Sequence, residues 1–374
     1  MLIKGNYQKG LSTTHCLIDV YHHLMSGAEK SKNVGTLVLT DFSKAFDLID
    51  HKITVTKLLK LGVSPSLVQW VVDFLSGRKQ RVKYKNTYSE WVELQGGVPQ
   101  GTIIGPIAFL GMINDALTDF DDNRMKVWKY VDDLTIGENR AIDDVTEVQQ
   151  CLESLHEWSV SNKLKLNPSK CQAMSVYFGQ NNPPDVDLRI SEHSLAVVQK
   201  VKLLGVIIQN DLKWQGQVDN MHSKANGKMF MLRKLKEAGL NAGEILSVYK
   251  GYMRPVLEYA APLWHAGLAQ SQEDRLERIQ KRVCKLLLGK EYRSYSDSLA
   301  ILDLQPLHTR RRQICKEFAS KAHASEKFSR WFPATDYSSS MTLRKPPKVK
   351  SYRWKTKRFK ESPVPYMAEL LNQA

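Results

Sequence analysis

The segment TLVLTD (Thr36–Asp41) sets the architecture expected for this chain. Its apolar and β-branched residues are typical of a buried strand. Asp41 follows the strand directly, and a carboxylate in that position projects past the sheet edge, where a site can be assembled. A lone aspartate after a strand is usually a loop start or a helix cap. The functional interpretation therefore depends on the rest of the chain.

A pair of aspartates, Asp132 and Asp133, separates two further expected strands, Met125–Val131 and Leu134–Ile136, in a tight hairpin. If this hairpin pairs with the strand Thr36–Thr40, three carboxylates converge. Their mutual repulsion is relieved when cations lie between them. Mg²⁺ is the usual cation where phosphates also bind. Two such ions about 4 Å apart would activate a 3′-hydroxyl and stabilise a leaving pyrophosphate.

The remaining elements predict an α+β fold with a small, mostly antiparallel sheet that is covered by helices on one face. Ser64 is a candidate cap, and Pro65 suits a first helical turn. Further strands are expected at Gln172–Phe178 and Val201–Ile208, and helices at His51–Leu61, Ser64–Ser76, Ile107–Leu117 and Asp144–Lys163.

Length and charge restrict the class of protein. The chain has 374 residues, which corresponds to two or three domains, and its net charge of +15 favours a polyanionic partner. Five scattered cysteines form no C-x-x-C motif, so neither a disulfide framework nor a zinc knuckle is expected. No apolar run approaches the roughly 18 residues of a membrane span. We expect an intracellular protein, in the nucleus, the cytoplasm or both, with no membrane partner.

Five motifs follow one another along the chain: LTDFSKAFD (Leu39–Asp47), GVPQG (Gly97–Gly101), YVDD (Tyr130–Asp133), LNPSK (Leu166–Lys170) and KLLGV (Lys202–Val206). In this order they resemble the motifs of reverse transcriptases, and most closely those of non-LTR (LINE-type, jockey/CR1-like) retrotransposons. The resemblance implies a right-hand polymerase with a palm, partial fingers and a helical thumb.

The resemblance also implies a catalytic role for four residues. Asp41 and Asp132 would bind two Mg²⁺ ions, with Mn²⁺ as a substitute, and Asp133 would complete the triad. The backbone carbonyl of Phe42 is the implied further ligand. Lys170 would lie near the pyrophosphate as a general acid; a solvated lysine after a proline turn is an equal alternative.

Substrate contacts follow from the same resemblance. Phe46 matches the aromatic gate that excludes a 2′-hydroxyl, although a core aromatic is an equally good reading. The backbone amides of Lys44 and Ala45 would hold the triphosphate. Gln100 and Gly101 would approach the nucleic acid, and the alternative there is an ordinary Gly-Pro turn. The implied primer grip consists of Leu203, Leu204 and Gly205.

The sequence departs from the family at Lys9–Thr14, KGLSTT, where Leu11 replaces an arginine that would contact the triphosphate. Lys9 would substitute only in part, because lysine cannot form a bidentate clamp. The chain begins inside this box, so an N-terminally truncated polymerase is expected. We assign residues 1–34 to partial, irregular fingers, 35–210 to the palm with the remaining fingers elements, 211–300 to the thumb and 301–374 to a basic C-terminal region.

The expected function is RNA-directed DNA polymerisation, with an RNA template, a DNA primer and dNTPs as partners. The basic residues of the expected thumb would contact a hybrid duplex, or would form a solvated face. They are Lys224, Lys228, Arg233, Lys234, Lys236, Arg275, Arg278, Lys281, Arg282 and Lys285. The apolar residues among them are expected in the core: Met229, Phe230, Leu232, Leu276, Ile279, Val283, Leu286 and Leu287. The tail at 352–360 would bind RNA, or would be a disordered end or a localisation signal. A catalytically inactive, nucleic-acid-binding remnant is the main alternative, and a metal-dependent nuclease is a weaker one.

Overall fold

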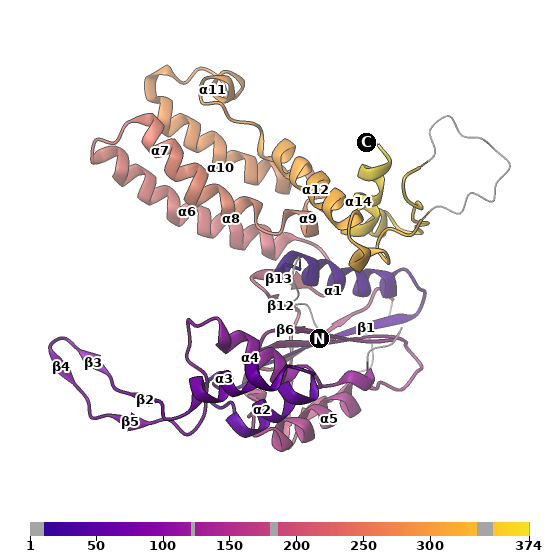
Figure 1. Cartoon of the computed structure of the whole chain (residues 1–374). Coiled ribbons are helices and arrows are strands. Elements are labelled where there is room, and N and C mark those ends of the chain that lie inside the picture. Colours follow the sequence, from indigo (N-terminus) through magenta and orange to yellow (C-terminus); the bar gives the residue numbers. More distant parts are fainter. Residues whose placement is uncertain (1–10, 121–123, 180–185, 335–346, 374) are drawn as a thin grey trace. The chain divides into compact units, whose positions relative to one another are not determined.

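The computed structural model describes residues 11–120, 124–179, 186–334 and 347–373 (Figure 1). The chain forms two compact units. The first contains the described residues up to Cys16 together with Lys32–Gln199, and the second contains Leu17–Ser31 and the chain from Lys200 onward. Within the segments expected from the sequence, Leu17–Ser31 of the segment 1–34 and the stretch from Lys200 to 210 of the segment 35–210 belong to the second unit.

The first unit is built on a five-stranded sheet with the order β11-β8-β1-β7-β6. Strand β1 lies at the centre of the sheet, and its middle residues are buried. This burial explains why its sequence is a continuous apolar run. All pairs are antiparallel except β11 with β8, so the sheet is mixed. The strands are β1 (Asn33–Thr40), β6 (Met125–Tyr130), β7 (Asp133–Ala141), β8 (Gln172–Val176) and β11 (Ala196–Val197).

Helices cover one side of this sheet (Figure 1), as the sequence predicts. Helix α4 is apolar all round, and seven of its ten residues are buried, although Ile107 is 45% exposed. Ser64 precedes α3 as expected, but its side chain makes no capping hydrogen bond, whereas Asp50 does cap α2. The helices of the first unit are α2 (His51–Lys60), α3 (Pro65–Leu75), α4 (Ile104–Ile113) and α5 (Val148–Ser161).

Four short strands between α3 and α4 form an extended hairpin that was not expected from the sequence. They are β2 (Lys79–Gln80), β3 (Lys83–Tyr84), β4 (Thr87–Tyr88) and β5 (Val92–Glu93), and all their residues are exposed. The pairs are β2 with β5 and β3 with β4. A separate small hairpin consists of β9 (Arg189–Ile190) and β10 (His193–Ser194).

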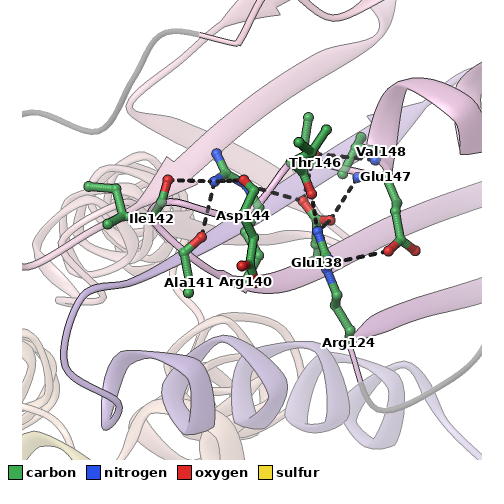
Figure 2. A network of polar contacts seen from close by, with 10 residues as sticks. Arg124, Glu138, Arg140, Ala141, Ile142, Asp144, Thr146, Glu147 and Val148 are labelled. Atoms are coloured by element: carbon green, nitrogen blue, oxygen red, sulfur yellow. Dashed lines mark hydrogen bonds and ion pairs between the residues drawn. The ribbon is translucent and has the colours of Figure 1, made fainter.

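A buried carboxylate ties β7 to the start of α5 (Figure 2). The Glu138 side chain is fully buried and accepts hydrogen bonds from Arg124 Nη2 (3.1 Å), Thr146 Oγ1 (2.6 Å) and the Glu147 amide (2.9 Å). Arg140 Nε lies 3.6 Å from Glu138 Oε2. With this many partners, the buried charge is compensated and fixes the connection between strand and helix.

The second unit is mostly helical and includes one strand pair, β12 (Lys200–Leu203) and β13 (Val206–Gln209). Helix α1, which belongs to this unit from Leu17 onward, lies within the segment that was expected to be irregular, so that prediction was wrong. The helices are α1 (Thr13–Ala28), α6 (Gln215–Glu237), α7 (Ala242–Val248), α8 (Arg254–Glu258), α9 (Ala261–Trp264), α10 (Gln270–Leu288), α11 (Tyr295–Ile301), α12 (Leu307–His323), α13 (Lys357–Lys360) and α14 (Pro363–Asn372).

The segment Val201–Ile208, expected as one strand, is a hairpin instead. Its register pairs Leu203 with Val206, and both turn residues, Leu204 (φ 43°) and Gly205 (φ 85°), are left-handed. Two positive φ angles are what a two-residue hairpin turn requires. The turn was not predicted, because only one of its two residues is glycine and leucine is not a typical turn residue.

The described part of the basic C-terminal region contacts other elements of the second unit. Helix α14 buries most of its residues and packs against α12. The Tyr352 hydroxyl donates to the Trp331 carbonyl (2.8 Å), and Phe359 is buried against His22 of α1.

All five cysteines are buried, and none forms a disulfide. No helix in the described parts of the chain is long and apolar enough to cross a membrane.

Candidate active site

The central strand pair brings the predicted aspartates together. The β1–β7 register pairs Thr40 with Leu134, and one step further it places Asp41 opposite Asp133. In a regular antiparallel pair such residues have Cα atoms about 5 Å apart. Asp132 lies next to them in the β6–β7 turn, because Tyr130 pairs with Asp133. The three aspartates therefore lie at one end of the sheet, and Asp133 is close enough to Asp132 and Asp41 for their charges to raise its pKa.

The LNPSK motif holds Asp41 in position through the backbone. The Asp41 amide donates to Cys171 Sγ (3.4 Å), and the Asp41 carbonyl accepts from the Asn167 amide (2.8 Å). The neighbouring Ser43 amide donates to the Lys165 carbonyl (2.7 Å), which makes an isolated bridge between Phe42 and Leu166. In this bridge type the Phe42 carbonyl points away from its partner strand, so the implied metal ligand is not used by the bridge.

Charge at the site is uneven. Lys170 Nζ lies 3.6 Å from Asp41 Oδ2, an oxygen that is buried and receives no hydrogen bond in the described part of the chain. The pKa of Asp133 is raised, first by desolvation of its carboxyl and then by repulsion from Asp132 and Asp41. The two neighbouring carboxylates thus add to the cost of ionising Asp133, which burial already raises.

The donor chemistry of this site fits a hard divalent cation, because carboxylate oxygens and a backbone carbonyl are its preferred ligands. Asp41 Oδ2, buried without a donor, supports the fit. Among the described residues, however, no group of three or more His, Cys, Asp or Glu side chains is arranged to hold a metal ion. The three-carboxylate centre with Asp41, Asp132 and Asp133 therefore stays a prediction.

The residues after Asp41 turn back into the core. Phe42 is buried, with its ring 6.3 Å from that of Trp158, and Ala45 is buried as well. Lys44 is exposed in a left-handed conformation (φ 49°). Phe46 stacks on Phe109 with ring centroids 5.1 Å apart and remains only partly buried. Phe46 thus contacts the core, as a core aromatic would, and also keeps the partial exposure that a gate beside the substrate requires.

The GVPQG loop packs directly on that turn. The Gly97 amide donates to the Ile49 carbonyl and the Val98 amide to the Phe46 carbonyl, both at 2.8 Å. A Cβ on Gly97, whose φ is 76°, would lie 2.7 Å from the Asp47 carbonyl oxygen, so only glycine fits there. Gln100 and Gly101 are exposed on the same loop. Two motifs far apart in sequence are therefore locked together by backbone contacts.

The turn that carries Asp132 contains an unusual backbone conformation. Val131 has a φ of 57°, whereas Asp132 does not have a positive φ. A left-handed β-branched residue is a genuine outlier and costs on the order of 1–2 kcal/mol. Such strain concentrates at functional sites. It was not foreseen, because the sequence alone shows only an ordinary valine between strand residues.

Two further sets of expected contact residues are not among the described residues of the first unit. Leu203, Leu204 and Gly205 belong to the second unit, where the Tyr259 hydroxyl donates to the Leu204 carbonyl (2.8 Å). Lys9 lies outside the described residues. The roles of both groups stay predictions.

Basic side chains of the second unit gather beside one cavity. Four cations of α10, with His222 and Tyr292, line a cavity of about 400 Å³: Arg278, Lys281, Arg282 and Lys285. The apolar residues Leu276, Ile279, Val283 and Leu287 recur at helical spacing and are buried, as predicted. Phe230 of α6, which was expected in the core, is 62% exposed, with Lys234 Nζ 5.7 Å from its ring centre.

Comparison with known proteins agrees with this geometry. A palm-like sheet with aspartates at the end of paired strands is the architecture of a polymerase. Residues 5–208, more than half of the chain, match the family described as reverse transcriptase (RNA-dependent DNA polymerase), and the chain belongs to this family.

Several retrotransposon proteins are similar over most of the chain. The RNA-directed DNA polymerase from mobile element jockey of Drosophila funebris is 23% identical, over 83% of this chain and 35% of its own length. In Drosophila melanogaster, the probable RNA-directed DNA polymerase from transposon X-element is 24% identical (78% and 32% coverage), and the putative 115 kDa protein of element R1DM is 26% identical (76% and 27%). The chain thus spans about a third of the length of these relatives.

A solved structure of telomerase from Candida tropicalis with a fragment of telomeric RNA is 11% identical, covers 96% of this chain and 49% of that chain, and has a TM-score of 0.45. This similarity is too low to support a functional inference.

Proposed function

We propose that this chain carries the polymerase centre of a non-LTR retrotransposon reverse transcriptase, which adds dNTPs to a primer 3′-hydroxyl opposite an RNA template. The observation that carries the proposal is the placement of Asp41 opposite Asp133 and beside Asp132 at the end of the β1–β7 pair. Membership of the family supports the same reaction.

Each residue then has a chemical task. Asp41, Asp132, Asp133 and the Phe42 carbonyl would hold two divalent ions, Mg²⁺ or Mn²⁺. Bound there, these ions would lower the pKa of the primer hydroxyl and offset charge on the leaving pyrophosphate. Lys170, whose ammonium already lies 3.6 Å from Asp41, would donate a proton to the leaving group.

Selection of the substrate would depend on the turn after β1. The exposed edge of Phe46 would exclude a 2′-hydroxyl, while its stacking on Phe109 keeps the ring in place. The amides of Lys44 and Ala45 would bind phosphate oxygens. Gln100 and Gly101, held by the packing of Gly97, would contact the nucleic acid, and Leu203–Gly205 would contact the primer.

Primer extension tests the proposal. The purified chain is given a DNA primer annealed to RNA, dNTPs and Mg²⁺, and the Asp132→Asn variant is compared with it. Incorporation by the chain and its loss in Asp132→Asn support the proposal. Asp73→Asn, an exposed residue of α3, is the matched control and should extend normally. Equal background from the chain and Asp132→Asn would overturn the proposal and leave a nucleic-acid-binding remnant.

A further inference from the structure

The extended hairpin of the first unit combines cations with exposed aromatic rings. The sequence from Arg78 to Glu93, RKQRVKYKNTYSEWVE, contains five basic residues and two acidic ones. The residues of β2–β5 are all exposed, and the rings of Tyr84 and Trp91 are 72% and 57% exposed. An isolated two-stranded hairpin gains little from such side chains unless they contact something else.

A β-bulge places two of the rings on one face. The register pairs Gln80 with Val92 and Lys83 with Tyr88, so two residues of one strand lie opposite the three residues 89–91 of the other. The Ser89 amide donates to the Val82 carbonyl (2.9 Å) across this step. Without the extra residue, strand alternation would direct positions 88 and 91 to opposite faces.

Cations and rings interleave on this bulged face. The Arg81 guanidinium lies 4.0 Å from the ring centre of Tyr88 and 4.5 Å from that of Trp91. Lys83 Nζ lies 5.4 Å from the Tyr88 ring centre. Contacts of this kind hold rings and cations in place without removing them from solvent.

The charges of the face are left uncompensated. Lys79 pairs with Glu93 at 3.1 Å, but no carboxylate of the described residues forms an ion pair with Arg81, Lys83 or Lys85. A phosphate chain offers the missing negative charge, and bases offer flat surfaces to the rings. A positively charged groove with stacking rings is the general means of binding single strands.

We propose that the bulged face of this hairpin, formed by Arg81, Lys83, Tyr88 and Trp91, binds a single strand of nucleic acid. Arg81, Lys83 and the nearby Lys85 contact the phosphates, and bases stack on Tyr88 and Trp91. An acidic protein surface would satisfy the charges but would leave the rings without flat partners. The inference deepens the proposed function, because a template ahead of the primer is such a strand.

Binding without dNTPs tests the site separately from polymerisation. Fluorescence anisotropy of labelled oligouridine RNA, oligothymidine DNA and a blunt duplex, each about 15 nucleotides long, is measured with the full chain. The variant Tyr88→Ala/Trp91→Ala should bind either single strand roughly tenfold or more weakly. The variant Arg81→Gln/Lys83→Gln/Lys85→Gln should lower the slope of log affinity against log salt by about 2.

The matched control is Val82→Thr/Val92→Thr, which changes two exposed valines of the same hairpin and should bind as the unmodified chain does. Weaker RNA and DNA binding in the ring variant supports the site, and a loss for RNA alone identifies contacts to the 2′-hydroxyl. Unchanged single-strand binding in both variants, an equal loss in the control, or a loss confined to the duplex would overturn it.

Primer extension across a one-nucleotide template overhang separates the two proposals. Such a substrate contains almost no single strand, so the ring variant should extend it normally. If the unmodified chain binds RNA through the hairpin but extends no primer, the proposed function fails and the hairpin site stands. If the unmodified chain extends primers but the hairpin variants bind single strands as well as it does, the hairpin site fails and the proposed function stands.

Discussion

Lys170 Nζ lies 3.6 Å from Asp41 Oδ2, which joins the cation of one motif to the carboxylate of another. The segment that ends in Lys170 also fixes Asp41 through the Asn167 amide and the Cys171 thiol. Position and charge of the aspartate are thus set by the same short stretch of chain. The ion pair is largely exposed, so its contribution to stability is small.

Replacing Lys170 should therefore reduce turnover without loosening the fold. We expect Lys170→Ala to lower the single-turnover rate of primer extension by about 10²–10⁴, the usual contribution of a general acid. Lys170→Arg keeps the charge but is a poor proton donor, and it should remain impaired. Thermal melting of both variants should be nearly unchanged. Full activity of Lys170→Ala would show that this lysine is only a solvated neighbour.

Asp133 should destabilise the metal-free protein. The pKa of Asp133 is higher in the folded protein than in the unfolded chain, so its ionisation lowers the free energy of unfolding. This loss of stability is complete above the folded pKa and disappears as the pH falls below the unfolded pKa. In chelator, Asp133→Asn should therefore melt at a higher temperature than the unmodified chain near pH 8. The difference should shrink toward pH 4 (about the ordinary pKa of an aspartate). Melting curves across this range, with Asp73→Asn as control, check the sign.

Relieving the strain at Val131 should stabilise the protein. Glycine accepts a φ of 57° without cost but loses more entropy on folding, so we expect Val131→Gly to gain roughly 0.5–1 kcal/mol. Val131→Ala should fall between valine and glycine. Denaturant unfolding of the three proteins measures the order. A destabilised glycine variant would mean that side-chain packing of Val131 outweighs its backbone strain.

The buried network around Glu138 should dominate the stability of the first unit. Glu138→Ala leaves Arg124 and Arg140 without their shared carboxylate and should cost about 3–5 kcal/mol. Glu138→Gln keeps the shape and should cost less. The exposed Glu153 of α5 supplies the control, and Glu153→Ala should lie within about 0.5 kcal/mol of the unmodified chain. Urea unfolding distinguishes these cases.

The sequence predicts those strands and helices whose structure a local pattern determines. The strand before Asp41, the hairpin at Asp132–Asp133 and the helices α2 and α3 follow from apolar runs and stop signals that act over a few residues. The placement of Asp41 opposite Asp133 followed from assuming that neighbouring motifs pair. The ordered motifs identified the family, because their spacing carries more information than any one of them.

Other features depended on contacts that no local pattern records. Glu138 looks like any charged strand residue until its partners at Arg124 and Thr146 are known. The turn at Leu204 was missed because a leucine replaces the expected turn residue. Helix α1 was missed although its buried residues Leu17, Tyr21, Leu24 and Met25 recur at helical spacing, so a local signal for it was present.

Helix α1 has its partners at the other end of the chain. Asp19 contacts Trp331 and Arg330, and Glu29 accepts hydrogen bonds from the amides of Lys355 and Thr356. During synthesis, this side of an early helix leaves the ribosome long before the residues that will cover it have been translated. Because late, long-range closure slows folding, a nascent chain stalled before residue 330 should expose α1 to proteases and chaperones. Completion of the second unit therefore has to wait until the segments around Trp331 and Thr356 have left the ribosome.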